Sequence, residues 1–151
     1  MDTKTLFVYY SFSGNGDLIA EAFREKGAEV RKVTPKRNLP KSFFWSVMTG
    51  GFLATIGHKS PLKGFDSDLS GYDKIVIGSP IWNGRLSCPI NTVLSDCDLA
   101  GKDIAFVLYA GGGEAPGAAE RLRQAYPNAT VTVLKDPKKY PEELEKLKDI
   151  E

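Results

Sequence analysis

The chain has 151 residues, a length that suits one α/β domain with a buried core. Its 20 lysine and arginine residues balance 19 acidic residues, so the net charge predicts no nucleic-acid partner. No apolar run approaches the roughly 20 residues that span a bilayer, and the N-terminal MDTKTL lacks the pattern of a secretory signal, so we expect a cytoplasmic protein without membrane insertion.

Strand-like and helix-like segments alternate along the chain, which predicts parallel βαβ units in one α/β domain spanning residues 1–151. The apolar runs are nearly continuous, as expected of strands buried on both faces. In chain order, the expected elements are a strand at Thr5–Ser11, a helix at Gly16–Lys26, strands at Glu29–Thr34 and Lys74–Ser79, a helix at Pro89–Asp96, a strand at Asp103–Tyr109, a helix at Pro116–Ala125, a strand at Thr130–Leu134 and a helix from Pro141.

The segment from Val30 to Phe65 contains no acidic residue. It is either a docking face for an acidic protein or an anionic second substrate, or a solvated surface beside a small hydrophobic cluster. Within it, Lys41–Gly57 has helical spacing that Gly50 and Gly51 interrupt, so we expect a broken helix that packs in the core, forms an aromatic flap or makes a dimer contact. The basic and aromatic residues are Arg31, Lys32, Lys36, Arg37, Lys41, Phe43, Phe44, Trp45, Phe52, Lys59, Lys63 and Phe65.

The first expected strand ends at a loop of hydroxyl-bearing and glycine residues, directly before the first helix. The unpaired backbone N–H groups and the positive dipole end of a helix N-terminus favour a phosphate group without any lysine or arginine. The sequence therefore predicts a phosphate-binding loop formed by Ser11, Phe12, Ser13, Gly14, Asn15 and Gly16.

Two further loops follow the third and fourth expected strands, at residues 78–85 and 110–114. Ligands of open parallel sheets bind beyond the carboxyl ends of the strands, so we expect these loops to meet the phosphate loop. They supply the indole of Trp82, an Asn83-Gly84 turn and a glycine run that lets the backbone approach a flat ligand. A phosphate beside a flat ring predicts a mononucleotide, and the indole suits a flavin.

Three motifs in chain order, YYSFSGNG, GYDKIVIGSPIWNGRLSCPINTVL and AFVLYAGGGE, resemble those of the flavodoxin family in its short form. The resemblance implies a three-layer sandwich around a five-stranded parallel sheet in the order 2-1-3-4-5, with FMN at the switch point. It assigns Ser11, Phe12, Ser13, Gly14, Asn15 and Gly16 to the FMN phosphate, Pro80, Ile81, Trp82, Asn83 and Gly84 to the ring and ribityl chain, and Ala110, Gly111, Gly112 and Gly113 to the other side of the ring.

Two features depart from the family pattern. Flavodoxins usually have threonine where this chain has Gly16, so one phosphate-binding hydroxyl is missing. We expect FMN affinity to fall by roughly one to two orders of magnitude unless backbone contacts compensate. Electron-carrying flavodoxins are typically acidic, whereas this chain is nearly neutral, so its redox partners need not be the usual ones.

The resemblance implies an electron carrier, monomeric or dimeric, that passes electrons from a reductase to an acceptor protein. The flavin would cycle between oxidised, semiquinone and hydroquinone states, while the protein sets its potential. The Asn83-Gly84 peptide is expected to turn a carbonyl toward the flavin N5–H, because both residues tolerate positive φ. The alternative for this pair is a plain tight turn.

Two other functions are compatible with the residues. An NAD(P)H-dependent FMN or quinone reductase would use Arg85, Lys59 or His58 at a nucleotide phosphate. A flavodoxin-like binding module that has lost FMN is supported by Gly16 alone. A kinase-type phosphate loop is excluded because the required Gly-Lys-Ser/Thr is absent.

Four remaining residues have plain structural interpretations. His58 has no cysteine, histidine or carboxylate cluster around it in the sequence, so we expect a surface residue rather than a metal ligand. Cys88 and Cys97 share one predicted loop and helix, which is weak evidence for a disulfide and fits a reducing compartment, and Cys88 is interpreted as a buried or bystander thiol rather than an activated one. Tyr109, at a strand end, either flanks the ring or packs in the core.

Overall fold

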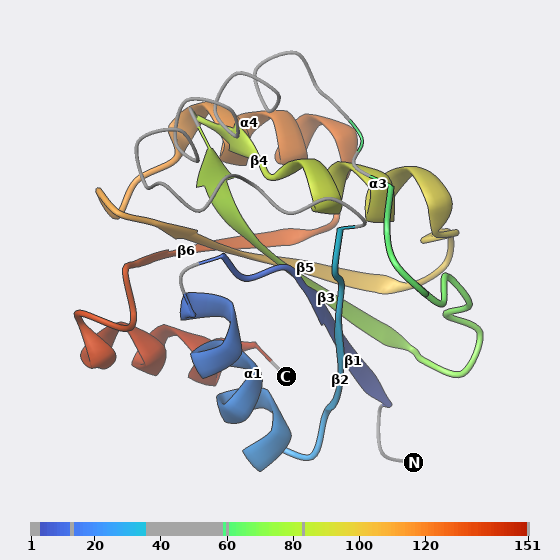
Figure 1. Cartoon of the computed structure of the whole chain (residues 1–151), viewed down its shortest axis with the longest axis horizontal. Helices are drawn as coiled ribbons and strands as arrows, with labels where there is room; N and C mark the ends of the chain where they lie inside the picture. Colours follow the sequence, from blue (N-terminus) through green and yellow to red (C-terminus); the bar gives the residue numbers. More distant parts are fainter. Residues whose placement is uncertain (1–3, 13, 36–58, 60, 83, 151) are drawn as a thin grey trace.

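The computed structural model describes residues 4–12, 14–35, 59, 61–82 and 84–150. These residues form a twisted sheet of five parallel strands (Figure 1). A short further strand, β4 (Arg85–Leu86), pairs antiparallel with the end of β3. Across the sheet the parallel strands lie in the order β2 (Glu29–Lys32), β1 (Thr5–Tyr9), β3 (Lys74–Trp82), β5 (Asp103–Ala110) and β6 (Thr130–Lys135).

Helices cover both faces of the sheet (Figure 1). Helix α1 (Asn15–Glu25) and the 3₁₀ helix η1 (Pro141–Asp149) lie on one face, and α3 (Cys88–Asp96) and α4 (Pro116–Ala125) lie on the other. The predicted fold class is confirmed, because the five parallel strands follow the order 2-1-3-4-5 when numbered along the chain. None of the helices in the described part of the chain has the length and apolar character that a membrane-spanning segment needs.

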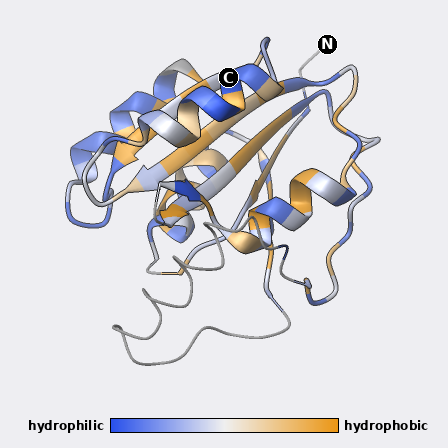
Figure 2. Ribbon diagram, turned by 90° about the horizontal axis from the view of Figure 1, so that it is seen from above, coloured by the Kyte–Doolittle hydropathy of each residue, from blue (hydrophilic) through white to orange (hydrophobic). Residues whose placement is uncertain are grey.

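The three central strands, β1, β3 and β5, are largely buried, which explains their nearly continuous apolar sequence, whereas the edge strands β2 and β6 are only partly buried. On β1, Leu6 and Val8 join the core beneath α3 and α4, whereas Phe7 and Tyr9 join the core beneath α1 and η1. Figure 2 shows strands coloured mainly as hydrophobic between helices of mixed colouring. The alternation along β1 places its last residue, Tyr9, under the first turn of α1, next to the predicted phosphate loop.

An aromatic stack joins α1 to the sheet and depends on Gly78 of β3. The Phe7 ring stacks on Tyr9, with ring centroids 5.0 Å apart, and on Phe23 of α1 at 4.6 Å. A Cβ atom at Gly78 would lie 2.6 Å from the Phe7 ring, so only glycine permits this close approach. The stack supports the strand end from which the phosphate loop leaves the sheet.

The prediction that residues 78–82 form a loop was wrong, because β3 continues to Trp82. The register pairs Pro80 with Tyr109 of β5 and Trp82 with Arg85 of β4. An Asn-Gly pair between two strand-like segments is a strong hairpin signal, so the sequence contains a signal for these flanking strands as well as for the turn. The indole of Trp82 is therefore carried on a hydrogen-bonded strand.

Candidate functional site

The carboxyl ends of β1, β3 and β5 lie side by side at one edge of the sheet (Figure 1). The register pairs Tyr9, the last residue of β1, with Gly78 of β3, and Pro80 of β3 with Tyr109 of β5. The three segments that the sequence assigns to a mononucleotide site therefore leave the sheet at a common edge, where parallel sheets bind their ligands.

The predicted phosphate loop is organised around the side chain of Ser11. Ser11 Oγ accepts hydrogen bonds from the backbone N–H groups of Gly14 and Gly16, each at 3.1 Å. Gly14 caps α1 with a left-handed backbone, φ 101°, and the N–H of Leu18 donates to its carbonyl. The helix N-terminus thus faces the loop, and the Ser11 hydroxyl can still donate its own proton to a phosphate oxygen. Ser13 lies outside the described residues.

The packing around Gly16 leaves no space for a side chain at this position. A Cβ atom at this position would lie 2.8 Å from Ser11 Cβ, from the Tyr109 hydroxyl oxygen and from the Tyr9 ring. The Tyr109 hydroxyl donates to the backbone carbonyl of Tyr10, which ties the end of β5 to the end of β1. Burial raises the pKa of Tyr109 well above its ordinary value, so the hydroxyl keeps the proton that it donates. Of the two interpretations of Tyr109, core packing is confirmed.

A charged network lies beside the loop on the β2 side. Tyr9 Oη donates to Asp17 Oδ1 at 2.8 Å, and Lys32 Nζ lies 2.9 Å from the same oxygen. Partial burial of Asp17 raises the pKa of its carboxyl, but the hydrogen bonds from Lys32 and Tyr9 outweigh that effect and lower it overall. The Lys32 ammonium therefore offsets the negative charge that Asp17 brings to the first turn of α1, which reduces its repulsion of a bound phosphate.

A fourth segment, which sequence reasoning missed, also reaches this edge. In the connection from β6 to η1, the N–H of Lys138 donates to Asn15 Oδ1 at 2.9 Å, and the N–H of Asp136 donates to the Ala110 carbonyl at 3.3 Å. Lys138 Nζ lies 3.6 Å from the position of a Cβ on Gly14. Its sequence signal is the run KDPKK at the end of the last strand. The site predicted from the sequence comprises only the loops that follow the first, third and fourth strands.

Trp82 contacts two aromatic residues, Tyr10, which directly follows β1, and Phe12 of the predicted phosphate loop. Its ring packs edge-on against Tyr10, with centroids 5.6 Å apart and an angle of 88°, and against Phe12 at 6.5 Å and 89°. Phe12 is 46% exposed, and no other large hydrophobic side chain in the described residues is classed as exposed. An exposed aromatic beside a partly buried indole forms an apolar surface next to the phosphate loop.

The Trp82 hairpin is held at both ends by polar contacts. At its base, the buried Ser79 Oγ accepts from the Ser87 N–H at 3.0 Å and lies 2.9 Å from Ser87 Oγ. At its turn, Arg121 Nη2 of α4 donates to the Gly84 carbonyl at 2.6 Å. Gly84 has φ +74°, in the left-handed region that favours glycine. Asn83 lies outside the described residues.

The glycine loop after β5 forms an open wall at the same edge. Ala110 is buried, and its carbonyl accepts from the Gly113 N–H at 3.0 Å to close a turn. A Cβ on Gly111 or Gly112 would have nothing within 4 Å, so the backbone here is open to a ligand. The structure thus brings together the described members of all three predicted segments, with Pro80 and Ile81 on the strand leading to Trp82.

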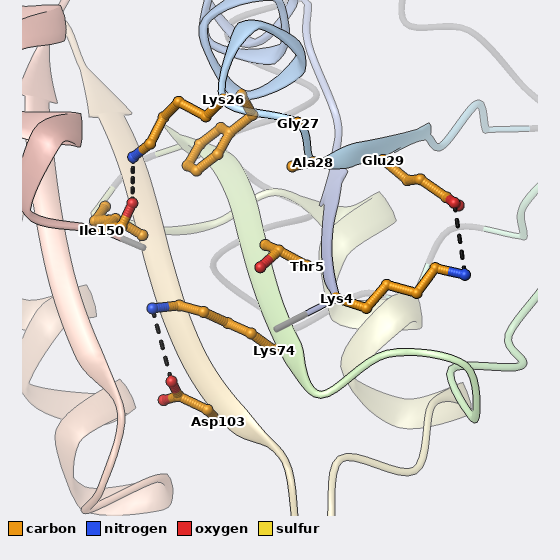
Figure 3. A pocket seen from close by; sticks show the side chains of 10 residues that line it. Lys4, Thr5, Lys26, Gly27, Ala28, Glu29, Lys74, Asp103 and Ile150 are labelled. Atoms are coloured by element: carbon orange, nitrogen blue, oxygen red, sulfur yellow. Dashed lines mark hydrogen bonds and ion pairs between the residues drawn. The ribbon is translucent and has the colours of Figure 1, made fainter. Parts of the chain in front are cut away.

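A cavity of about 890 Å³ lies at the opposite edge of the sheet (Figure 3). It is lined by residues from the amino ends of the strands, and its lysines have partners within the chain. Lys74 lies 3.6 Å from Asp103, Lys4 lies 3.7 Å from Glu29, and Lys26 Nζ donates to the Ile150 carbonyl. The amino edge is not where parallel sheets bind ligands, so this cavity is not the candidate site.

Neither a metal centre nor a disulfide is found in the described residues. They contain no group of three histidine, cysteine or acidic residues placed to hold a metal. Cys88 and Cys97 are both buried and are not joined in a disulfide, and burial raises the pKa of Cys97 to about 11. His58 and Lys41–Gly57 lie outside the described residues.

Basic residues of the segment from Val30 to Phe65 contact other parts of this chain where the structure describes them. Arg31 donates to the carbonyls of Asp66 and Asp68, and Lys59 donates to Ser95 Oγ. Because residues 36–58 lie outside the described part, the docking face stays a prediction.

Comparisons with known proteins identify the family. The profile described as Flavodoxin matches residues 52–146, more than half of the chain, and these residues do not include the phosphate loop. No curated protein matches the chain. A flavoprotein from Lactobacillus acidophilus in complex with FMN is similar in structure, with 22% identity, a TM-score of 0.71, and coverage of 93% of this chain and 98% of that one.

Two further solved structures share the fold. The apo-form of the Lactobacillus acidophilus flavoprotein has 23% identity and a TM-score of 0.63, covering 95% of this chain and 98% of that one. A candidate flavoprotein from Bacteroides eggerthii has 19% identity and a TM-score of 0.70, covering 99% of this chain and 98% of that one. The family match and the strand order lead to one conclusion: the chain belongs to the flavodoxin family.

Proposed function

We propose that the protein binds FMN noncovalently at the carboxyl edge of its sheet and carries electrons between partner proteins. The observation that carries this proposal is the adjacency of two surfaces. The Ser11-centred loop at the N-terminus of α1 suits a phosphate, and the Trp82 surface formed with Tyr10 and Phe12 suits a flat ring. The FMN complex of the Lactobacillus acidophilus relative supports the choice of cofactor.

The residues at this edge fit FMN in chemical terms. Ser11 would donate its hydroxyl to the phosphate, and the N–H groups of the first turn of α1 would bind the phosphate oxygens. Trp82 would pack against the ring, and the open backbone at Gly111 and Gly112 would face its other side. When bound, FMN supplies one-electron and two-electron transfer, while the protein sets its access and potential.

The peptide that joins Asn83 to Gly84 is proposed to adjust the potential by offering a carbonyl to the flavin N5–H. This part of the proposal is a hypothesis carried over from the sequence, since Asn83 lies outside the described residues. The positive φ of Gly84 supports it, because glycine lowers the cost of turning that peptide. Arg121 holds the next carbonyl, that of Gly84, so the rotation would be confined to the peptide before it.

The function is tested by titrating apoprotein with FMN and then reducing the complex stepwise under anaerobic conditions. We expect stoichiometric binding and a long-wavelength absorption band of one-electron-reduced flavin midway through the reduction. Rapid bleaching by NADPH alone would replace the carrier with the reductase alternative. Absence of FMN binding would overturn the proposal and favour a binding module without a flavin.

Replacing Ser11 with alanine is expected to weaken FMN binding by about tenfold and to lower the free energy of unfolding by about 1 kcal/mol. The substitution removes the acceptor of the Gly14 and Gly16 N–H groups and one phosphate donor. Isothermal titration calorimetry and urea unfolding measure the two effects. The control is Ser95→Ala, which removes a hydroxyl bonded only to the exposed Lys59 in the described contacts. An unchanged FMN affinity in Ser11→Ala would remove this loop from the phosphate site.

A further inference from the structure

We propose that Lys138 is a second phosphate-binding element, which places an ammonium group over the N-terminus of α1 and gives the site its preference for phosphorylated flavin. The proposal rests on the FMN-binding function argued above and adds a residue to it. Lys138 belongs to the connection between β6 and η1, which the flavin motifs of the sequence do not include.

The backbone of this connection is held against the site at two points. The Asn15 side chain at the start of α1 accepts from the Lys138 N–H at 2.9 Å, and the Ala110 carbonyl in the glycine loop accepts from the Asp136 N–H at 3.3 Å. Pro137 between them is buried, and the N–H groups of Lys139 and Tyr140 both donate to the Asp136 carbonyl at 2.9 Å. The position of Lys138 is therefore set by the same residues that form the phosphate loop and the ring wall.

The side chain of Lys138 extends over the residue that caps the helix. Its Nζ atom lies 3.6 Å, and its Cδ atom 3.8 Å, from the position that a Cβ would occupy on Gly14. Gly14 has no side chain to separate the ammonium from the N–H groups of the first turn. A phosphate bound at that turn would therefore meet both the helix dipole and a lysine ammonium.

The charge of Lys138 can replace the phosphate-binding hydroxyl that is missing at Gly16. The packing of Tyr9, Ser11 and Tyr109 around Gly16 leaves no space for the threonine hydroxyl that flavodoxins usually have there. The nearby Lys32 ammonium lies 2.9 Å from Asp17 Oδ1, so its charge is directed to that carboxylate. The Lys138 ammonium lies 3.6 Å from the Cβ position of Gly14, where it adds a positive charge beside the loop. It compensates for the missing hydroxyl through charge.

The test compares FMN with riboflavin, which has the same ring and no phosphate. For Lys138→Ala we expect the FMN dissociation constant to rise about tenfold, the riboflavin constant to change less than about twofold, and the salt dependence of FMN binding to decrease. The matched control is Lys139→Ala, which removes an adjacent exposed lysine that lies over Tyr140. It should leave both constants within about twofold of wild type.

The role of Asn15 is tested in the same assay. Asn15→Ala removes the acceptor of the Lys138 N–H and should weaken FMN binding without adding fully to the effect of Lys138→Ala, because both changes act on one contact. Equal weakening of FMN and riboflavin by Lys138→Ala would show that the loop is only structural and would overturn the proposal. An unchanged FMN constant would overturn it as well.

A measurement on apoprotein separates this inference from the proposed function. Inorganic phosphate should raise the melting temperature of wild-type apoprotein more than that of Lys138→Ala, with chloride at equal ionic strength as the reference. If wild type bound phosphate in this way but bound no FMN, the proposed function would fail. Lys138 would still be a phosphate-binding residue. If both proteins responded alike while wild type bound FMN, the inference about Lys138 would fail alone.

Discussion

Gly16→Thr is expected to destabilise the apoprotein by about 3 kcal/mol and to leave FMN binding no tighter, although it introduces the residue that most flavodoxins have at this position. The added Cβ would lie 2.8 Å from atoms of Ser11, Tyr9 and Tyr109, and threonine adds two further atoms to that Cβ. The three neighbours are held by packing and by the hydrogen bond from the Tyr109 hydroxyl to the Tyr10 carbonyl. Moving them away from the added atoms would therefore cost free energy. Urea unfolding measures the loss.

Two control variants locate the cause of this effect. Gly71→Ala adds a Cβ that would have nothing within 4 Å, and its expected change in unfolding free energy is below about 0.5 kcal/mol. Tyr109→Phe removes the hydroxyl oxygen, one of the three atoms that would lie 2.8 Å from the added Cβ. Gly16→Ala should therefore cost less in the Tyr109→Phe background than in wild type. A fully stable Gly16→Thr variant with tighter FMN binding would contradict the prediction. It would show that threonine fits at this position and that Ser11, Tyr9 and Tyr109 are not packed closely around it.

The strands could be predicted from local sequence patterns, above all from runs of apolar residues. Ile75, Val76 and Ile77 form a continuous apolar run because β3 is covered by helices on both faces. The start of α1 could be placed because glycine follows the hydroxyl-bearing residues at the end of the first run. The strand order was implied by the resemblance of the three motifs to flavodoxins, and the parallel strands of the structure have that order.

The hairpin at Trp82 shows where local rules were insufficient. Pro80 lacks a backbone N–H and reads as a loop residue, yet it pairs in register with Tyr109. The extension of β3 depends on the buried contact between Ser79 and Ser87, and two serines in a sequence do not indicate that they will be buried together. Pairing with β5 therefore overrode the loop character of Pro80, whereas the Asn-Gly signal in the sequence agrees with the hairpin.

The two features of the phosphate site that sequence reasoning missed are both non-local. Gly16 looked like a lost hydroxyl, whereas the structure shows a position filled by Tyr109 from a distant strand. Lys138 is 123 residues from Asn15, its backbone partner, and its run of lysines resembles an ordinary solvated turn. Such contacts are set by the sheet order, so they can be inferred only after the strands have been placed.

Trp82→Ala is expected to raise the dissociation constants of FMN and riboflavin alike, by roughly 30-fold to 100-fold. Among the described residues, the indole supplies the largest flat apolar side chain at the carboxyl edge, and its loss removes about 2 to 3 kcal/mol of stacking and burial. Trp82→Phe keeps an aromatic ring on the same strand and should recover most of the affinity. Quenching of flavin fluorescence during titration measures both constants.

The effect of Trp82 on the two flavins separates its role from that of Lys138. A group that contacts only the ring changes both constants by the same factor, whereas a group that contacts only the phosphate changes the FMN constant alone. Phe12→Ala is the comparison within the aromatic surface, because its exposed ring touches Trp82 from one side and should cost less. If Trp82→Ala bound both flavins as wild type does, the ring would lie away from the β3–β4 hairpin. The Ser11 loop would then bind the phosphate of a ligand whose flat part contacts a different surface.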